Sequence, residues 1–308
     1  MKLKPILALM LSGILIISPL EGNAQSNEVN EEVLSVIEAK IQEIDNLLLS
    51  SPDKVQCYDI CTQAEIEKQK ETFLDQVNNI HVVVEEYFNS LDESVQSYEY
   101  EALAEKLDEL DLEANKIQGE GEDSDSILMD GTEESNSLSA TKYWRYGDIL
   151  YYGIGSDSSA GEPSFTGHTA VLSTTDYYVI EASKTSRSGN KVHHWNRDKL
   201  WKGASGIKQY KVTTLLGRNA TATERKNAVT FGLNQKGEPY SLKTALWNNN
   251  YWYCSKLTMR QWHNAGYDLR GARGLHWSGY LLVIPFDIRI DANTRLIKNW
   301  GTSLPGKI

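Results

Sequence analysis

The charge of this chain changes sign between its two halves. Residues 25–140 hold 30 Asp and Glu against 6 Lys and Arg, a net charge of −24, whereas residues 141–308 carry a net charge of +12. The chain as a whole has 308 residues and a net charge of −11. A composition shift of this size is typical of a domain boundary. We therefore expect two regions with different structures, separated by a domain boundary.

The acidic region has the apolar spacing of amphipathic helices. Apolar residues recur at steps of three and four in its first segment, at Val33, Leu34, Ile37, Ile41, Ile44, Leu47 and Leu48. Thr62 and Glu65 have the spacing of a capping box at the start of a second helix, and a third helical stretch covers residues 93–117. This periodicity predicts a small helical bundle or a bent coiled coil over residues 25–118.

Two further segments have compositions unlike those of folded domains. Residues 119–141 are rich in Gly, Ser and acidic residues, and such a segment buries too little apolar surface to order itself, so it is predicted to be a disordered linker. At the other end, Lys2 and Lys4 precede an apolar run over residues 5–20 and the small residues Gly22 and Ala24. This pattern predicts a signal peptide over residues 1–24, the alternative being a retained anchor helix.

Secretion makes the three cysteines informative, because cysteines outside the cell usually form disulfides. Cys57 and Cys61 are four residues apart and are candidates for a local disulfide. Cys254 is then left over, as a free thiol that needs an explanation. It is either an inert core residue or a nucleophile.

The sequence pattern of the basic region predicts an α+β fold. Strand-like runs cover residues 148–152, 169–172, 177–182, 207–212 and 280–284, and helices are expected at 223–234 and from Cys254 to His263 or Asn264. Strands with few helices in this order favour an antiparallel sheet packed by helices, over residues 142–308. Its lysines form no stripe, so we expect no nucleic-acid partner. An anionic cell-wall polymer fits a basic extracellular domain better.

A predicted hairpin brings a histidine to a carboxylate. His168 and Glu181 lie on neighbouring strand-like runs, with Thr174 and Thr175 at the turn. For a two-residue turn, residues whose numbers add to 349 face each other, so His168 and Glu181 are expected to be direct cross-strand neighbours, with Cβ atoms about 5 Å apart. The carboxylate would then orient the imidazole, which is the third role in a catalytic triad.

Cys254 supplies the remaining group. It stands at the start of a predicted helix, where the helix dipole and a nearby imidazolium lower a thiol pKa. Tyr240 and Tyr253 are candidates for the oxyanion and substrate side of the site.

The remaining histidines do not indicate a metal site. His193 and His194 are expected in a loop, and Cys254 with His263 lacks the ligand spacing of a zinc site. No metal and no cofactor is therefore expected.

Several motifs, taken in their order along the chain, resemble a known family. They are similar to those of the permuted papain-like amidases of the YiiX/YaeF type, which are related to the NlpC cell-wall peptidases: Gly147-Asp148-Ile149-Leu150, Gly167-His168, Glu181-Ala182, Gly237-Glu238-Pro239-Tyr240 and Tyr253-Cys254-Ser255. The resemblance covers about residues 143–287. It implies a circularly permuted papain-like core, with Cys254 as nucleophile, His168 as base, Glu181 as orienting acid and Tyr240 as a donor on the oxyanion side. Lys256 departs from the pattern, which usually has Glu there.

The sequence therefore predicts a cysteine amidase or peptidase in the bacterial cell envelope or secreted from the cell, acting on peptides such as peptidoglycan stem peptides. One alternative is a lipid-directed acyltransferase or esterase, since lecithin:retinol acyltransferases share the permuted order. Another is a non-catalytic wall-binding module.

The opposite charges of the two regions also predict that the acidic helices dock on the basic domain. The acidic region would then be a pro-region that shields the cleft. The alternatives are a solvated spacer and a module that binds a separate partner. No membrane span is expected after signal cleavage.

Overall fold

The computed structural model describes residues 31–54, 62–89, 98–118, 145–153, 167–173, 177–184, 189–270, 275–277, 280–302 and 304. The predicted signal peptide, the predicted Cys57–Cys61 disulfide and the predicted linker lie outside these residues. Within the described ranges, no helix combines the length and the apolar character that crossing a membrane requires.

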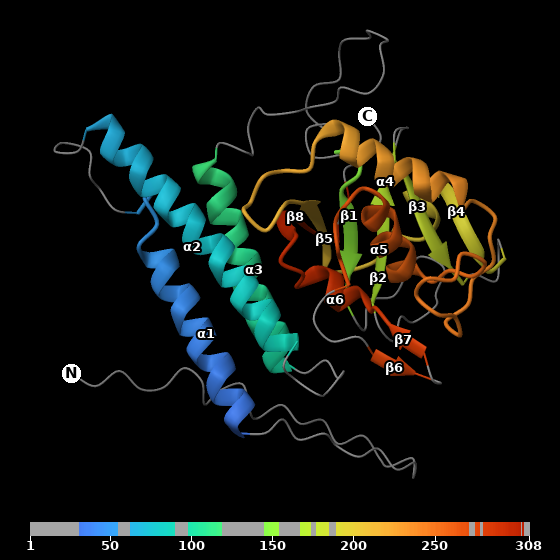
Figure 1. Cartoon of the computed structure of the whole chain (residues 1–308), viewed down its shortest axis with the longest axis horizontal. Coiled ribbons are helices and arrows are strands. Elements are labelled where there is room, and N and C mark those ends of the chain that lie inside the picture. Colours follow the sequence, from blue (N-terminus) through green and yellow to red (C-terminus); the bar gives the residue numbers. More distant parts are fainter. Residues whose placement is uncertain are drawn as a thin grey trace, which may run out of the picture.

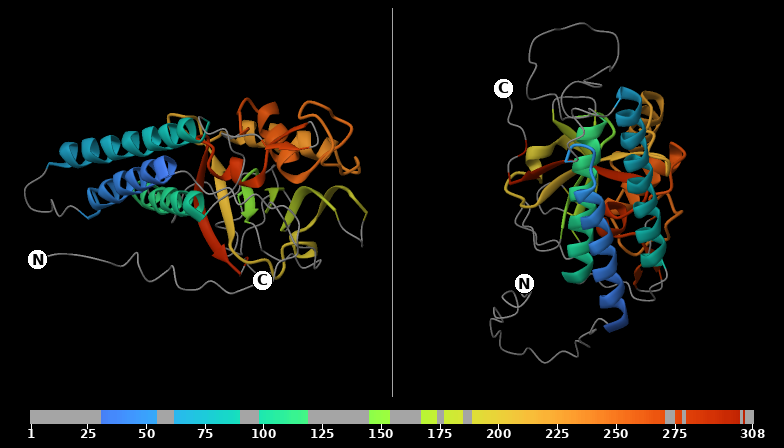
Figure 2. Two further views of the ribbon diagram at one scale, coloured as in Figure 1. Left: turned by 90° about the horizontal axis from the view of Figure 1, so that it is seen from below. Right: turned by 90° about the vertical axis from the view of Figure 1, so that its left-hand side faces the viewer.

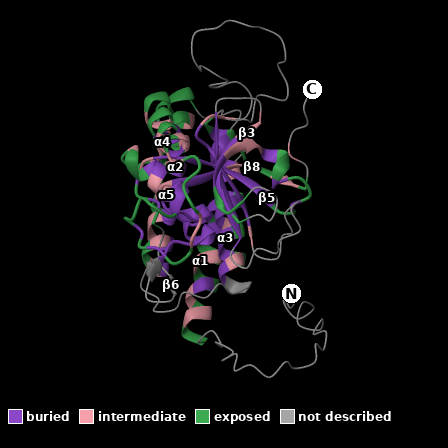
Figure 3. Ribbon diagram, turned by 90° about the vertical axis from the view of Figure 1, so that its right-hand side faces the viewer, coloured by how far each residue is buried: buried purple, intermediate pink, exposed green. Residues whose placement is uncertain are grey.

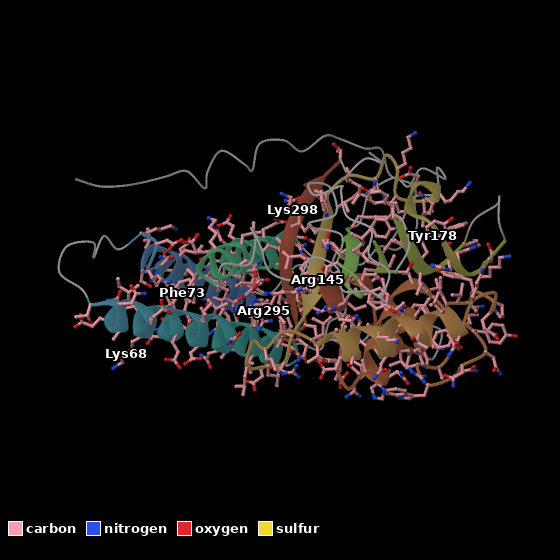
Figure 4. All side chains as sticks on the ribbon, turned by 90° about the horizontal axis from the view of Figure 1, so that it is seen from above. Lys68, Phe73, Arg145, Tyr178, Arg295 and Lys298 are labelled. Carbon is pink, nitrogen blue, oxygen red and sulfur yellow. The ribbon has the colours of Figure 1, made fainter. Side chains whose placement is uncertain are left out.

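Three helices form the N-terminal bundle: α1 (Glu31–Leu49), α2 (Gln63–Asn89) and α3 (Tyr98–Ile117). They form because their apolar residues recur on one face, which each helix turns toward the others. Figure 4 shows this on α2, where Phe73 lies on the side facing the other helices and Lys68 lies on the far side. Acidic residues such as Glu38, Glu43 and Glu67 are exposed on the outer faces, whereas Asp108 and Asp111 of α3 are buried.

The C-terminal region contains a six-stranded sheet in the order β4-β3-β2-β1-β5-β8, in which all neighbouring strands are antiparallel (Figure 1). Its strands are β1 (Ile149–Tyr152), β2 (His168–Leu172), β3 (Tyr178–Ser183), β4 (Lys191–Asn196), β5 (Ile207–Val212) and β8 (Thr294–Gly301). The predicted α+β class is confirmed. The expectation of a loop at His193 and His194 is wrong, because both lie on β4, where His193 pairs with Glu181.

Both faces of the sheet are covered. One face packs against α4 (Ala222–Asn234) and α5 (Cys254–Asn264), and the other packs against the chain around the short helix η2 (Arg197–Lys199) and Trp201. Figure 3 shows the central strands buried while α4 presents exposed residues to solvent. A two-stranded sheet of β6 (Leu275–Trp277) and β7 (Tyr280–Leu282) then leads into α6 (Pro285–Arg289).

The helical bundle packs against the β8 edge of the sheet (Figure 2). Asp111 of α3 accepts a hydrogen bond from the Leu296 backbone N–H at 2.7 Å, and Asp108 pairs with Lys208 of β5 at 2.7 Å. Acidic side chains of α3 thus meet basic side chains of the sheet. Strands β1 and β5 separate β8 from β2 and His168, so these contacts do not involve His168.

Candidate active site

Cys254 is the first residue of α5, and its thiol faces β2. The helix begins here because Tyr253 has extended backbone angles, and no side chain caps the first turn. Cys254 is 8 % exposed. Its sulfur is in hydrogen-bond contact with the His168 ring and with the Thr169 backbone N–H. A hydrogen bond of 3.0 Å between the Thr169 and Thr258 hydroxyls also ties β2 to α5. The free cysteine and the histidine that the sequence singled out therefore meet.

His168 and Glu181 also meet, although by a different register from the one predicted. The His168 Nε2 and a Glu181 carboxylate oxygen are 2.6 Å apart. Strands β2 and β3 pair Val171 with Ile180 and Leu172 with Val179, so the numbers of facing residues add to 351 and the predicted sum of 349 is wrong. A shift of two residues keeps both side chains on the same face of the sheet. Glu181 therefore reaches His168 diagonally.

Two tryptophans that the sequence did not reveal hold the carboxylate. The indole N–H of Trp201 donates to Glu181 at 2.9 Å, and the indole N–H of Trp195 donates to its other oxygen. Trp195 is in turn stacked on His193, with ring centroids 3.8 Å apart. Glu181 is completely buried, and a buried carboxylate is costly without such partners. Two indole donors and the imidazole satisfy it.

The His168 ring is fixed on its faces as well as at its edge. The rings of Tyr152 and Trp201 lie 5.5 and 5.4 Å from it, between centroids. Because Nε2 is engaged with Glu181, Nδ1 is the nitrogen left to face the Cys254 sulfur. A carboxylate partner keeps the proton on Nε2 in the neutral ring. The free lone pair of Nδ1 is then available to take the thiol proton.

The electrostatics favour a charged thiolate–imidazolium pair. Burial by itself would lower the pKa of His168, but Cys254 and then Glu181 outweigh it through charge and hydrogen bonding, and raise that pKa to about 10. Burial would raise the pKa of Cys254, but the charge and hydrogen bond of His168, then the Thr169 N–H and Ser255, lower it below its usual value. A thiol with a depressed pKa next to an imidazolium is the form that attacks carbonyl carbon.

Comparison with known proteins finds one matching family. Residues 143–277 match the family model described as permuted papain-like amidase enzyme, YaeF/YiiX, C92 family. Over these residues the chain is similar to the permuted papain-like amidases. The family supports a cysteine hydrolase in general. No curated protein matches the chain.

A solved structure, described as metalloprotein YiiX from Escherichia coli O157:H7, is similar to part of this chain. The sequence identity is 17 % and the TM-score is 0.38, and the similarity covers 50 % of this chain and 97 % of the other. In the portion of the present chain that the structure describes, no group of three or more His, Cys, Asp or Glu residues is arranged to hold a metal ion.

The two tyrosines predicted near Cys254 have different surroundings. The Tyr240 backbone lies beside Trp252, in a parallel bridge, and its N–H donates to Asn190 O at 2.9 Å. Tyr240 is thus held close to the start of α5, and its role as a donor stays a prediction. The Tyr253 hydroxyl accepts a hydrogen bond from the Val283 N–H at 3.2 Å, and the residue is 1 % exposed. Its hydroxyl thus ties the start of α5 to Val283, and its role on the substrate side stays a prediction.

Lys256, which departs from the family pattern, is a buried structural cation. Its ammonium donates to three backbone carbonyls in the preceding loop at 2.6–2.8 Å, those of Ala245, Asn248 and Tyr251. Burial and the nearby Arg260 lower its pKa to about 7, while the carbonyl acceptors act in the opposite direction because they stabilise the charged form. The lysine therefore fastens the loop before Cys254 to the catalytic helix.

Proposed function

We propose that the chain is a secreted cysteine amidase that hydrolyses amide bonds with Cys254, His168 and Glu181. The observation that carries this proposal is the contact of the Cys254 thiol with His168, whose other nitrogen is bonded to a buried carboxylate. Nucleophile, base and orienting acid in one connected series is the arrangement that covalent catalysis by a thiol requires.

The reaction would proceed in two halves. With the thiol proton already on Nδ1 of His168, the thiolate attacks the amide carbonyl carbon to give a tetrahedral oxyanion. His168 then protonates the leaving nitrogen, the C–N bond breaks and a thioester remains on Cys254. A water molecule, deprotonated by His168, attacks the thioester and releases the carboxylic acid and the free thiol.

The oxyanion has donors available at the start of α5. The first N–H groups of a helix have no partner within the helix, and no side chain caps them here. Such donors stabilise charge that develops in the transition state. We propose that these groups, with the Tyr240 hydroxyl, receive the oxyanion.

For the substrate we propose a stem peptide of the bacterial cell wall. The predicted signal peptide and the +12 charge of residues 141–308 favour a substrate in an anionic cell envelope. The family description as an amidase favours an amide over an ester.

Trapping the thioester tests both the mechanism and the substrate class. The full chain is incubated with muropeptides and, separately, with phospholipid vesicles, quenched in acid and analysed by intact-protein mass spectrometry, with Cys254→Ala as the control. The proposal expects a peptidyl adduct from muropeptides that the Cys254→Ala variant does not form. A fatty acyl adduct alone would assign the site to lipid chemistry. An adduct on both the chain and the Cys254→Ala variant would refute Cys254 as nucleophile.

A further inference from the structure

The backbone of Val283 makes hydrogen bonds to both neighbours of the nucleophile. The Val283 N–H donates to the Tyr253 hydroxyl at 3.2 Å, and the Val283 carbonyl accepts from the Ser255 hydroxyl at 2.7 Å. Tyr253 and Ser255 flank Cys254. All of these groups are buried, so no water competes with the two bonds. The position of Val283 therefore helps to set the position of the first turn of α5.

The residues that follow Val283 belong to the core of the helical bundle. Ile284 and Phe286 pack in the same apolar cluster as the inward faces of α1, α2 and α3. The Phe286 ring is completely buried and meets Phe88 of α2 edge to face, with centroids 6.1 Å apart. Only a few residues therefore separate Val283, which contacts both neighbours of Cys254, from Phe286 in the bundle core.

A charged contact fixes the other end of the same segment. Arg289, the last residue of α6, donates to Glu105 at 2.8 Å, to Asp108 at 2.7 Å and also to Glu101, all on α3. The Arg289 side chain is 2 % exposed. Several carboxylates around one buried guanidinium form a specific anchor, because removing one side leaves a buried charge without a partner. The acidic character of α3 therefore has a defined role at this position.

We propose that the acidic helical bundle acts as an internal buttress for the nucleophile. Through residues 283–289 it fixes the start of α5, and so it fixes Cys254 against His168, which stands on β2 and is supported separately by Glu181, Trp195 and Trp201. This role goes beyond the proposed function and rests on it only in taking Cys254 as the reactive thiol. On this proposal, loosening the bundle lowers the reactivity of the Cys254 thiol. If the bundle were a pro-region that shields the site, loosening it would raise that reactivity.

The test compares two phenylalanines of the same helix. Phe88→Leu loosens the contact with Phe286, whereas Phe73→Leu changes the bundle core at a residue 3 % exposed, at a distance from α6 along α2. In the full chain, the rate of Cys254 alkylation by iodoacetamide is measured at pH 6, where the rate depends on the contact with His168. We expect Phe88→Leu to lower it about 10-fold, since small displacements of a reacting group have effects of this order or larger. We expect Phe73→Leu to leave it unchanged.

Equal rates in wild type and both variants, equal losses in both variants, or a faster rate in Phe88→Leu would overturn the buttress. Circular dichroism verifies that each variant is folded. If Phe88→Leu does not fold, the Glu101→Gln/Glu105→Gln variant replaces it, because it weakens the Arg289 anchor and leaves the apolar core intact. Its control is Glu109→Gln, which lies on the same helix and pairs with Lys106 on the surface of the bundle.

A double-mutant cycle tests the route through Val283. Tyr253→Phe removes the acceptor of the Val283 N–H and is expected to lower the alkylation rate by itself. If both changes act through the same segment, Tyr253→Phe combined with Phe88→Leu loses less than the product of the two single effects. Independent, multiplicative losses would refute this route. Alkylation needs no substrate, so these results are separable from a failure of the proposed amidase activity.

Discussion

Cys254→Ala is expected to lower kcat/KM for a cleaved amide by at least about 10⁴-fold, because loss of a covalent nucleophile costs a large part of the rate enhancement. Steady-state hydrolysis of the amide identified by acyl-enzyme trapping measures the effect. The change is small in volume at a site that is 8 % exposed, so the variant should fold normally by circular dichroism. Cys254→Ser is the matched control: it retains a hydroxyl of similar size, and because a serine is not ionised at this position it should also be nearly inactive. Activity within 10-fold of wild type in Cys254→Ala would contradict the role of Cys254.

Glu181→Gln is expected to lower kcat by about 10²- to 10⁴-fold with the protein still folded, by analogy with the tautomer effect known for serine protease triads. Glutamine would keep an acceptor for the indole of Trp195 but would lose the bond from Trp201, which donates to the same oxygen that faces His168. However, its NH₂ group would donate to His168 Nε2, so the ring proton would move to Nδ1, which could then no longer accept the thiol proton.

The same substitution should change the pH dependence with a definite sign. Glu181 contributes to the raised pKa of His168, so its neutralisation lowers that pKa. A weaker imidazolium stabilises the thiolate less, so the pKa of Cys254 rises, and the acidic limb of the kcat/KM profile moves to higher pH. Glu238→Gln, at an exposed position on the loop after α4, is the matched control and should leave the profile unchanged. An unshifted profile in Glu181→Gln would rule out the orienting role.

The sequence predicted which residues meet in the site but not how each is held. Strand side chains alternate between the two faces of a sheet, so the sequence could place His168 and Glu181 on the same face without fixing the length of the turn. The predicted register was wrong by two residues, which left both side chains on that face. Trp195 was missed because it follows His193 and His194 in a Lys- and Arg-rich segment with the composition of a loop, whereas that segment pairs as β4. Trp201 lies beyond β4, after η2, and its contact with Glu181 has no local sequence signal.

The helical region was predictable in kind, because its apolar periodicity is strong. The place where it packs was not, since opposite net charges favour association without selecting a surface. The contact depends on single residues, Arg289 with the carboxylates of α3 and Phe286 with Phe88. Neither pairing has a local sequence signal, as the partners are almost two hundred residues apart.

The most direct test of the central claim is the pH dependence of Cys254 alkylation by iodoacetamide in the wild-type chain. The lowered pKa of Cys254 and the raised pKa of His168, about 10, predict a thiolate already present at pH 6. The rate there should exceed that of free cysteine by at least about 10-fold, because a thiol of pKa about 8.5 is less than about 1 % ionised at this pH. It should then remain flat until His168 loses its proton in the alkaline range. A rate no faster than that of free cysteine at pH 6, rising with a pKa of about 8.5, would contradict an activated nucleophile at this position.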